Sequence, residues 1–360
     1  MTEYKAARCG IMRVMIPFSR RQLLLSIPGL ALAPRMAPGL FAQAAAPPLR
    51  VRGINHIGIA VADAKRSVDF YQGLFGMPVR GRQGSMTLLQ MGAGPQFLAI
   101  APAAAGAPAS ITHYCLGVEG FNLSRALAAL AANGVQKAAA IGPMKALVES
   151  RGPDMNGAKE GTAELSFGDP DGIVCQLQDA GYCGGAGPLG TVCGAPERAP
   201  KGLLALKDYS HLTIFATDAP RTNKFFTDLC GFSIRSYQGP TAPTLAVGPT
   251  VEFLMFTGGG PARAGAPPRA ASINHACMNM DAFKPDDVVK ALESYGLKPR
   301  DGAQGPVGPL RHYISMRMEN RGGAAEGTPE LYFTDPDGLL MQLQDTTYCG
   351  GGGYLGDVCK

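Results

Sequence analysis

Four histidines and two pairs of glutamines recur at matching positions along the chain. The glutamines stand in two related segments, FGDPDGIVCQLQD at 167–179 and FTDPDGLLMQLQD at 333–345. The histidines, four of the five in the chain, each lie in a short strand-like segment: His56, His113, His211 and His275. Imidazole nitrogens and amide oxygens can bind a divalent metal ion. A hydrogen-bonded histidine in a core is the simpler explanation for any one of them, but the fourfold repetition favours a shared site.

The alternation of side chains within each segment predicts which way these residues face. Successive residues of a strand point to opposite faces. In NHIGIAV, His56 therefore shares a face with Gly58, whereas the bulky Ile57 and Ile59 lie on the other. The glutamine segments alternate in the same way, with apolar residues opposite the glutamines. The DPDG sequence before each has the residues of a type I turn. We expect histidines and glutamines to line one concave surface.

The chain is a duplication of duplications. Residues 161–193 align without gaps to residues 327–359, and a Pro/Gly-rich linker at 194–202 separates the halves. Four smaller units begin at Ile54, Ile111, Ser210 and Ile273. Each unit starts with a strand, continues into a helix and ends in several short strands. Asp63 and Asp218 are suitable helix N-caps, and Gly134 and Gly296 are suitable helix stops. The pattern predicts an α+β fold of four βαβββ modules, in domains 51–193 and 203–360.

Four such modules, with NH, TH or SH in each first strand and DPDG before the last strand of each half, resemble the vicinal oxygen chelate superfamily. This superfamily includes glyoxalase I, extradiol dioxygenases and bleomycin-resistance proteins. The resemblance covers roughly residues 51–345. It implies that each half curls into a half-open, eight-stranded barrel around a metal ion.

The resemblance also implies the metal ligands. In the first barrel they are His56, His113 and Gln176. The second barrel has the corresponding set His211, His275 and Gln342. Glutamine replaces the family's usual glutamate in both, and a neutral amide binds Fe(II) more weakly than a carboxylate. The expected cofactor is a divalent metal, with Zn, Ni, Fe and Mn all open, and zinc or nickel tolerates glutamine best.

Two further residues make the second barrel the preferred site. The glyoxalase branch has a fourth ligand on the last strand of the odd-numbered module, where Glu252 lies in TVEFLMF and Gln96 in PQFLAIA. Glu252 is a candidate ligand or catalytic base. Tyr332 occupies the position of a catalytic tyrosine of extradiol dioxygenases, although an ordinary strand aromatic is the alternative.

Two arginines at matching places before the sequence EGT, Arg151 and Arg317, are candidate binding residues for an anionic substrate. The alternative is a solvated loop arginine.

The cysteines predict two local disulfides. The segments YCGGAGPLGTVC and YCGGGGYLGDVC place Cys183 near Cys193, and Cys349 near Cys359. In an oxidising compartment these would close two Gly-rich loops. Free thiols and bridges between the halves remain alternatives.

The first 44 residues resemble a twin-arginine export signal. SRRQLLL at 19–25 is followed by an apolar stretch and by AQA at 42–44, a small-residue cleavage site. An N-terminal amphipathic helix is the alternative. The net charge of the chain is +5, but this segment has six cations and one anion, so the remaining body is neutral. We therefore expect a periplasmic or secreted protein with no nucleic-acid partner and no membrane span in its mature form.

The leading hypothesis is an exported, metal-dependent enzyme that acts on a small oxygen-rich substrate as a lyase, isomerase or dioxygenase. The rival is a metal-free protein that sequesters a small molecule, as bleomycin-resistance proteins do. A homodimer is compatible with either.

Overall fold

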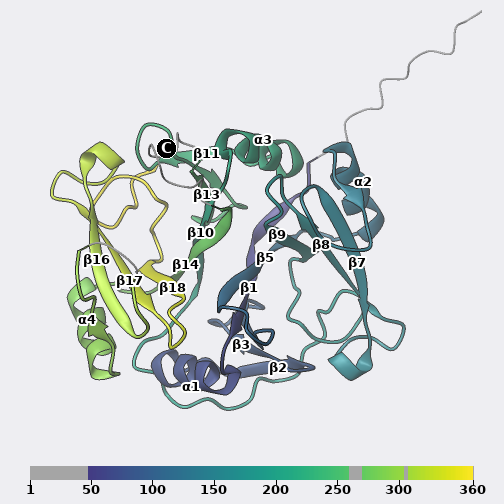
Figure 1. The fold of residues 1–360 in the computed structure, drawn as a ribbon, viewed down its shortest axis with the longest axis horizontal. Helices are drawn as coiled ribbons and strands as arrows, with labels where there is room; N and C mark the ends of the chain where they lie inside the picture. Colours follow the sequence, from purple (N-terminus) through teal and green to yellow (C-terminus); the bar gives the residue numbers. More distant parts are fainter. Residues whose placement is uncertain (1–47, 259–269, 304–306, 360) are drawn as a thin grey trace, which may run out of the picture. The chain divides into compact units, whose positions relative to one another are not determined.

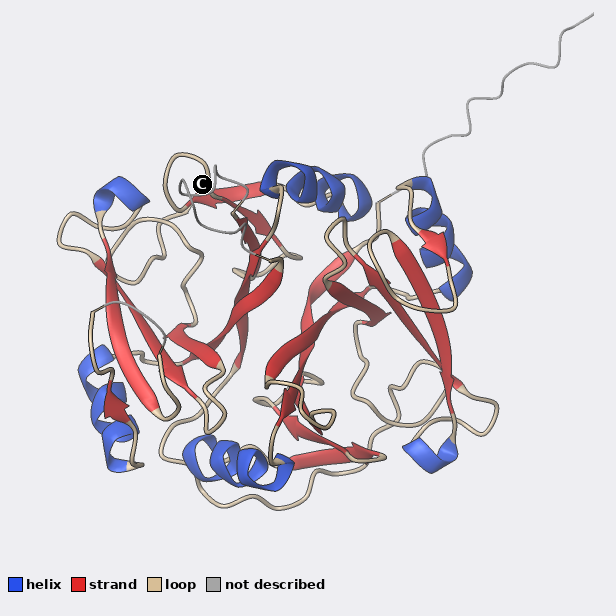
Figure 2. Ribbon diagram, in the orientation of Figure 1, coloured by secondary structure: helices blue, strands red, loops and turns tan. Residues whose placement is uncertain are grey.

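The architecture of the chain was obtained from a computed structural model (Figures 1 and 2). The structure describes residues 48–258, 270–303 and 307–359. The predicted export signal at 1–44 lies outside the described residues. The described residues form one compact unit. In the described part of the chain, every helix is too short or too polar to cross a membrane.

The described residues form eighteen strands, four α-helices and two short 3-10 helices. The α-helices are α1 (Ala64–Phe75), α2 (Leu123–Ala132), α3 (Ala219–Cys230) and α4 (Pro285–Ser294), and the 3-10 helices are η1 (Pro153–Met155) and η2 (Glu319–Arg321). The strands of the first half are β1 (Val51–Val61), β2 (Val79–Gln83), β3 (Met86–Gln90), β4 (Phe97–Pro102), β5 (Ser110–Val118), β6 (Gln136–Lys137), β7 (Lys145–Arg151), β8 (Thr162–Gly168) and β9 (Val174–Asp179). Those of the second half are β10 (Asp208–Phe215), β11 (Ile234–Tyr237), β12 (Pro243–Ala246), β13 (Phe253–Thr257), β14 (Ser272–Met280), β15 (Lys298–Pro299), β16 (Arg311–Arg317), β17 (Thr328–Thr334) and β18 (Leu340–Asp345).

Each half contributes one complete mixed sheet. The strand order is β2-β3-β4-β1-β5-β9-β8-β7-β6 in the first half and β11-β12-β13-β10-β14-β18-β17-β16-β15 in the second. This confirms four βαβββ modules, joined in pairs where β1 meets β5 and β10 meets β14 in antiparallel register. Each sheet has nine strands rather than eight, because the two-residue strands β6 and β15 extend one edge. Among the described residues no pairing joins the two edges of a sheet, so each barrel stays half open.

The helices begin and end where the local sequence dictates. The side chains of Asp63 and Asp218 accept hydrogen bonds from backbone N–H groups three residues later, at the starts of α1 and α3. Helix α1 ends at Gly76, whose φ of 67° is a left-handed conformation that glycine adopts without strain. The predicted stop Gly134 follows Asn133, the C-cap residue of α2, and likewise has a positive φ.

Each odd-numbered helix packs against the sheet of the other half. Phe75 of α1 has its ring 5.6 Å from that of Phe333 on β17, and Phe225 of α3 has its ring 6.0 Å from that of Phe167 on β8. Helix α1 also contacts β3 and β4 of its own sheet, and α3 contacts β13. The helices therefore cover apolar surface of both halves at once.

The DPDG turns tie these helices down. Arg66 of α1 forms a 2.9 Å ion pair with Asp337 in the second DPDG turn. Arg221 of α3 pairs with Asp171 in the first DPDG turn at 2.5 Å. The backbone N–H of Thr217, just before α3, also donates to Asp171. The turns thus join the halves as well as reversing the chain.

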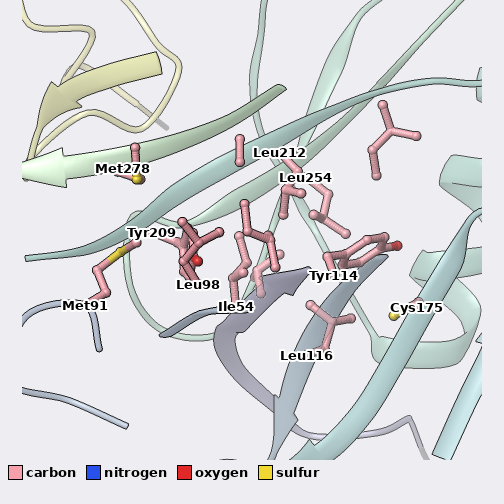
Figure 3. Close-up of a cluster of buried hydrophobic side chains, with 14 of the residues drawn as sticks. Ile54, Met91, Leu98, Tyr114, Leu116, Cys175, Tyr209, Leu212, Leu254 and Met278 are labelled. Carbon is pink, nitrogen blue, oxygen red and sulfur yellow. The ribbon is translucent and has the colours of Figure 1, made fainter. Parts of the chain in front are cut away.

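A single apolar core spans the two sheets (Figure 3). Ile54 and Leu116 of the first half and Leu212 and Leu254 of the second are all fully buried in it. The hydroxyl of Tyr209 donates to the carbonyl oxygen of Phe97 in the other half at 2.8 Å. The apolar faces of the strands lie on this core, so the histidines on the opposite faces look away from it.

Both predicted disulfides are present. Cys183 is bonded to Cys193 and Cys349 to Cys359, each across ten residues. The other described cysteines, Cys115, Cys175, Cys230 and Cys277, are free and buried.

Candidate functional site

The predicted ligand set of the first half lines a cavity of about 370 Å³. The cavity is bounded by His56 from β1, His113 from β5 and Gln176 from β9. The rings of the two histidines are 5.4 Å apart, edge to face. Gln176 lies within hydrogen-bonding reach of His56. Adjacent strands therefore bring the three side chains together, as the alternation predicts.

Each histidine is oriented by the side chain that precedes it. His56 Nδ1 is 2.8 Å from Asn55 Oδ1, and His113 Nδ1 is 3.0 Å from Thr112 Oγ1. Asn55 Nδ2 donates to the Tyr182 carbonyl oxygen, which fixes the amide with its oxygen toward His56. An amide oxygen only accepts, so His56 Nδ1 carries the proton and Nε2 keeps a lone pair. The second half repeats the arrangement with the pairs His211–Ser210 (3.1 Å) and His275–Asn274 (2.7 Å).

Burial keeps these imidazoles neutral. Desolvation lowers the pKa of His113 to about 4, and it lowers the pKa of His56 well below the ordinary value, helped by the nearby His113. In the second half desolvation lowers the pKa of His275 to about 4. Neutral imidazole is the form that binds a metal ion, so the histidines are competent ligands at pH 7.

Gly58 makes room for His113. A Cβ atom on Gly58 would lie 2.0 Å from His113 Cε1, far inside van der Waals contact. Thr213 holds the equivalent position, opposite His275, in the second half. The absence of a side chain at Gly58 therefore lets the His113 ring lie over β1.

Glu164 of β8 is an acid in the cavity that the sequence analysis missed. Its Oε2 accepts hydrogen bonds from Gln176 Nε2 and Gln178 Nε2, both at 2.5 Å. Its Oε1 accepts from Arg151 Nε at 2.7 Å and from the Tyr182 hydroxyl at 3.0 Å. Glu164 thus joins the glutamines to a buried arginine. The signal was the repeated EL in EGTAEL and EGTPEL, where Glu330 is the counterpart.

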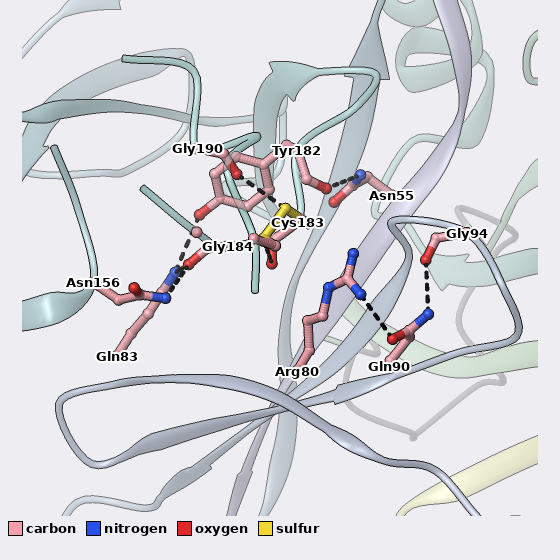
Figure 4. The surroundings of a disulfide bond; sticks show 12 residues. Asn55, Arg80, Gln83, Gln90, Gly94, Asn156, Tyr182, Cys183, Gly184 and Gly190 are labelled. Carbon is pink, nitrogen blue, oxygen red and sulfur yellow. Dashed lines mark hydrogen bonds between the residues drawn. A yellow bond between two sulfur atoms is a disulfide. The ribbon is translucent and has the colours of Figure 1, made fainter. Parts of the chain in front are cut away.

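The loop closed by the first disulfide lies beside Gln83, Asn156 and Tyr182 (Figure 4). The loop carbonyl of Gly184 accepts from Gln83 Nε2 at 3.0 Å, and that of Gly185 accepts from Arg151 Nη2 at 3.1 Å. Tyr182, next to Cys183, has its ring 5.7 Å from that of His56. The Gly-rich loop is therefore part of the wall of the site.

The predicted ligands of the second half also lie together, but they are buried. The rings of His211 and His275 are 5.5 Å apart. His211, His275 and Gln342 are at most 5% exposed, whereas His113 is partly exposed. Tyr332, in the position of Ser166, lies edge-on to His275 with ring centroids 5.3 Å apart. The tyrosine thus takes up space that is open in the first half.

Glu252 does not join the histidines, which corrects the predicted fourth ligand. The next residue, Phe253, stacks on His211 at 4.3 Å, so Glu252 points to the opposite face of the chain. Its carboxylate accepts a hydrogen bond from the backbone N–H of Ile54 in the other half. Gln96 also binds Ile54, because its Nε2 donates to the Ile54 carbonyl oxygen at 3.0 Å. Burial raises the pKa of Glu252 to about 8. Glu252 therefore joins the halves, while Gln96 holds the same strand from within the first half. One of the two sequence-based reasons for preferring the second barrel is thus removed, and Tyr332 is the one that remains.

Arg151 and Arg317 are buried and hydrogen-bonded, and Arg151 also lines the cavity of the first half. They end β7 and β16 and are 6% and 0% exposed. Arg317 Nε donates to Glu330 at 2.7 Å and its Nη2 to the Gly351 carbonyl oxygen at 2.9 Å. Arg151 donates in the same way to Glu164 and Gly185. The side chains hold the Gly-rich loops, so the solvated alternative is wrong, and the predicted substrate role stays a prediction.

The candidate metal sites of the two halves each combine two histidines with a glutamine. In the part of the chain that the structure describes, no three His, Cys, Asp or Glu side chains cluster in a way that could hold a metal ion. A larger hollow, of about 630 Å³, lies between the starts of β5 and β14, but no titratable side chain lines it. The His–His–Gln cavity of the first half therefore has the stronger chemistry.

Comparisons with known proteins agree with this architecture. The family model of the Glyoxalase/Bleomycin resistance protein/Dioxygenase superfamily matches residues 53–177. The uncharacterized protein YaeR of Escherichia coli (strain K12) is 26% identical over 148 residues, which are 40% of this chain and 99% of that protein.

Two solved structures share the fold of most of the chain. The Mn(II)-bound glyoxalase from Novosphingobium aromaticivorans has a TM-score of 0.56 and 17% identity, over 82% of each chain. The 2,3-dioxygenase LapB from Pseudomonas sp. KL28 has a TM-score of 0.55 and 16% identity, over 82% of this chain and 92% of that one.

Proposed function

Because residues 53–177 match the model of the Glyoxalase/Bleomycin resistance protein/Dioxygenase superfamily, we propose that the chain is a divalent-metal enzyme of that superfamily whose active site is the cavity of the first half. The observation that carries the proposal is the convergence of His56, His113 and Gln176 on that cavity. We propose a small oxygen-rich substrate and lyase, isomerase or dioxygenase chemistry. The Mn(II)-bound glyoxalase with the same fold supports a divalent cofactor.

The residues of the cavity fit a metal ion. His56 Nδ1 is committed to Asn55, which leaves the Nε2 lone pair free to bind a cation. The buried second set offers the same donors, since His275 Nε2 and Gln342 Oε1 have no hydrogen-bond partner. Buried polar atoms without partners cost free energy unless a ligand or ion satisfies them. His56, His113 and Gln176 would hold the metal in the first half.

The chain's own residues prepare the cavity for a small molecule. A volume of about 370 Å³ suits a ligand of a few to a dozen or so heavy atoms. Phe97 and Met86 supply apolar walls, while Ser166 places a hydroxyl beside the histidines. A divalent metal in such a site acts as a Lewis acid that polarises substrate oxygens. Stacking of His56 on Phe97, with ring centroids 4.3 Å apart, keeps the imidazole in position.

One observation favours the rival function, a metal-free binding protein. The donor set is neutral, and the nearby carboxylate Glu164 is already hydrogen-bonded to Arg151, Tyr182, Gln176 and Gln178. A neutral site binds a cation less tightly than a carboxylate site does. Sequestration of a small molecule would use the same cavity without any metal.

Metal analysis of the mature protein, purified without a histidine tag, separates the two functions. We expect close to one equivalent of Mn, Fe, Ni or Zn. We expect His56→Ala to remove most of the metal bound in the cavity of the first half, which is called the open site below. The matched variant His211→Ala tests the buried set in the same way. Less than about a tenth of an equivalent, with no metal-induced rise in melting temperature, excludes the enzyme and leaves the binding protein.

We further propose that the protein is exported to the periplasm or secreted by the twin-arginine route. Two disulfides support an oxidising compartment. Replacing Arg20 and Arg21 by lysine is expected to retain the protein in the cytoplasm, which cell fractionation measures. A homodimer stays a prediction that sedimentation can test.

A further inference from the structure

The two halves treat their ligand glutamines differently. Gln176 Nε2 is held by Glu164 Oε2 at 2.5 Å. With the nitrogen fixed there, the amide oxygen is the atom left to face His56, which lies within reach. Gln342 of the second half has no hydrogen-bond partner at either amide atom, although it lies beside His211 and His275. Only the first glutamine is therefore fixed in orientation by a hydrogen bond.

The difference arises from what surrounds the paired acids. Glu330, the counterpart of Glu164, accepts hydrogen bonds from Arg317 Nε and from the Tyr348 hydroxyl, as Glu164 does from its own partners. Its other oxygen, however, faces the Tyr332 hydroxyl at 3.4 Å. Ser166 replaces this tyrosine in the first half and is too short to compete. Glu164 Oε2 is consequently available to Gln176 and Gln178.

A carboxylate that accepts a hydrogen bond from an amide nitrogen polarises the amide and makes its oxygen a better donor to a cation. The same logic applies to metal-binding histidines whose far nitrogen is held by a carboxylate. In the first half this places a negative charge one hydrogen bond away from the ligand position. Arg151 donates to the other Glu164 oxygen, and the Tyr182 hydroxyl lies between the two oxygens, 3.0 Å from Oε1 and 3.2 Å from Oε2.

Building on the function proposed above, we propose that Glu164 is a positioning residue that acts through Gln176. It directs the amide oxygen toward His56 and His113 and supplies the negative charge that a neutral glutamine lacks. In this site the negative charge therefore lies on Glu164, the hydrogen-bond partner of the ligand Gln176, and not on the ligand itself. The second half has the equivalent acid, Glu330, but no hydrogen bond joins it to Gln342.

Titration of Mn²⁺ into chelator-treated protein tests this inference, with binding followed by calorimetry. We expect Glu164→Gln to weaken Mn²⁺ binding at the open site at least tenfold. The matched variant Glu330→Gln is expected to leave that affinity within twofold of wild type. The charge-swapped double variant Glu164→Gln/Gln176→Glu, which returns the carboxylate to the ligand position, is expected to restore it.

A double-mutant cycle distinguishes positioning from general structural support. If Glu164 acts through Gln176, Glu164→Gln has no further effect on Mn²⁺ affinity once Gln176 is alanine. Equal losses in both backgrounds overturn the inference. Should Glu164→Gln not fold, Glu164→Asp keeps the charge beside Arg151 but withdraws it from Gln176, and the same loss is expected.

The outcomes separate the two proposals. Wild-type protein that binds no Mn²⁺ overturns the proposed function together with this inference. Wild-type protein that binds Mn²⁺, with unchanged binding in Glu164→Gln and Glu164→Asp, overturns this inference alone.

Discussion

The imidazoles of the site are set by their immediate neighbours in sequence. Asn55, Thr112, Ser210 and Asn274 each place a side-chain oxygen against Nδ1 of the following histidine. A dipeptide thus carries both the imidazole that is proposed to bind the metal and the group that fixes its orientation. Because this pairing is local, it survives wherever the strand is copied, including the buried second half.

Gly58→Ala is expected to displace His113. The new methyl group would lie 2.0 Å from the ring, so the imidazole must leave its place over β1. We expect at least a tenfold loss of Mn²⁺ affinity and a cost of about 1–3 kcal/mol in unfolding free energy from overpacking. Calorimetric titration and chemical denaturation measure the two effects. Thr213→Ala, at the matching position of the second half, is the control, and wild-type affinity in Gly58→Ala would contradict the prediction.

Glu252 should make stability depend on pH. Burial raises its pKa from 4.5 to about 8 in the folded protein. Between these values the folded state holds a proton that the unfolded state has lost, so stability falls as pH rises, by about 1.4 kcal/mol per pH unit at most. The loss ends above about pH 8, where both states are ionised.

Glu252→Gln removes this titration and keeps an oxygen for the Ile54 N–H. We therefore expect the stability of the variant to vary less between pH 5 and pH 8 than that of wild type. Denaturation midpoints measured across that range provide the test. Parallel pH profiles for the two proteins would show that Glu252 is not protonated in the fold.

The sequence predicted the histidine and glutamine faces correctly because strand alternation is a local rule. It failed for Glu252, since alternation shows that Glu252 and Phe253 face opposite ways but not which of them faces His211. That choice depends on the stacking of Phe253 on the histidine and on the Ile54 N–H of the other half. Glu164 escaped notice because its importance depends on Arg151 and Gln176, which come from neighbouring strands.

At the scale of elements, each Gly-rich loop is closed by a disulfide and held by hydrogen bonds to a buried arginine. Their carbonyl oxygens accept hydrogen bonds from buried arginines, Arg151 in the first half and Arg317 in the second. Cysteine spacing was enough to predict each bond. It gave no indication that the loops satisfy arginines, because those contacts join residues more than thirty positions apart.

Removing either disulfide should cost similar stability but have different effects on the site. Replacing Cys183 and Cys193 by serine is expected to lower the unfolding free energy by about 2–3 kcal/mol, as is the same change at Cys349 and Cys359. Only the first pair is expected to weaken Mn²⁺ binding at the open cavity, because its loop carries Tyr182 and Gly185. Equal effects on binding from both pairs would contradict this.

At the scale of the whole molecule, the halves are expected to unfold together. Helix α1 packs against Phe333 of the second sheet and α3 against Phe167 of the first. Separation would expose both surfaces and break the pairs Arg66–Asp337 and Arg221–Asp171. We expect one calorimetric transition for the mature protein, and two resolved transitions would contradict this prediction.

The repeat and the modules were readable from the sequence because each copy preserves its own strand and turn signals. That α1 and α3 contact both sheets was not readable from the sequence. Phe167, Phe225 and Phe333 fit an ordinary core helix or strand equally well, and only the folded molecule shows whose surface each one covers.

The helices shared between the two sheets also affect how the duplicated halves can diverge. A second half that supplies α3 to the first sheet remains indispensable whether or not its own histidines meet a substrate. With the active site assigned to the first half, as proposed above, the second ligand set has no catalytic requirement to meet, whereas helix α3 is still needed. Tyr332 and the unpaired amide of Gln342 are features that the second half can carry without cost to the site in the first half. Duplication has thus produced two halves that depend on each other for packing, and the second can serve as structural support for the first.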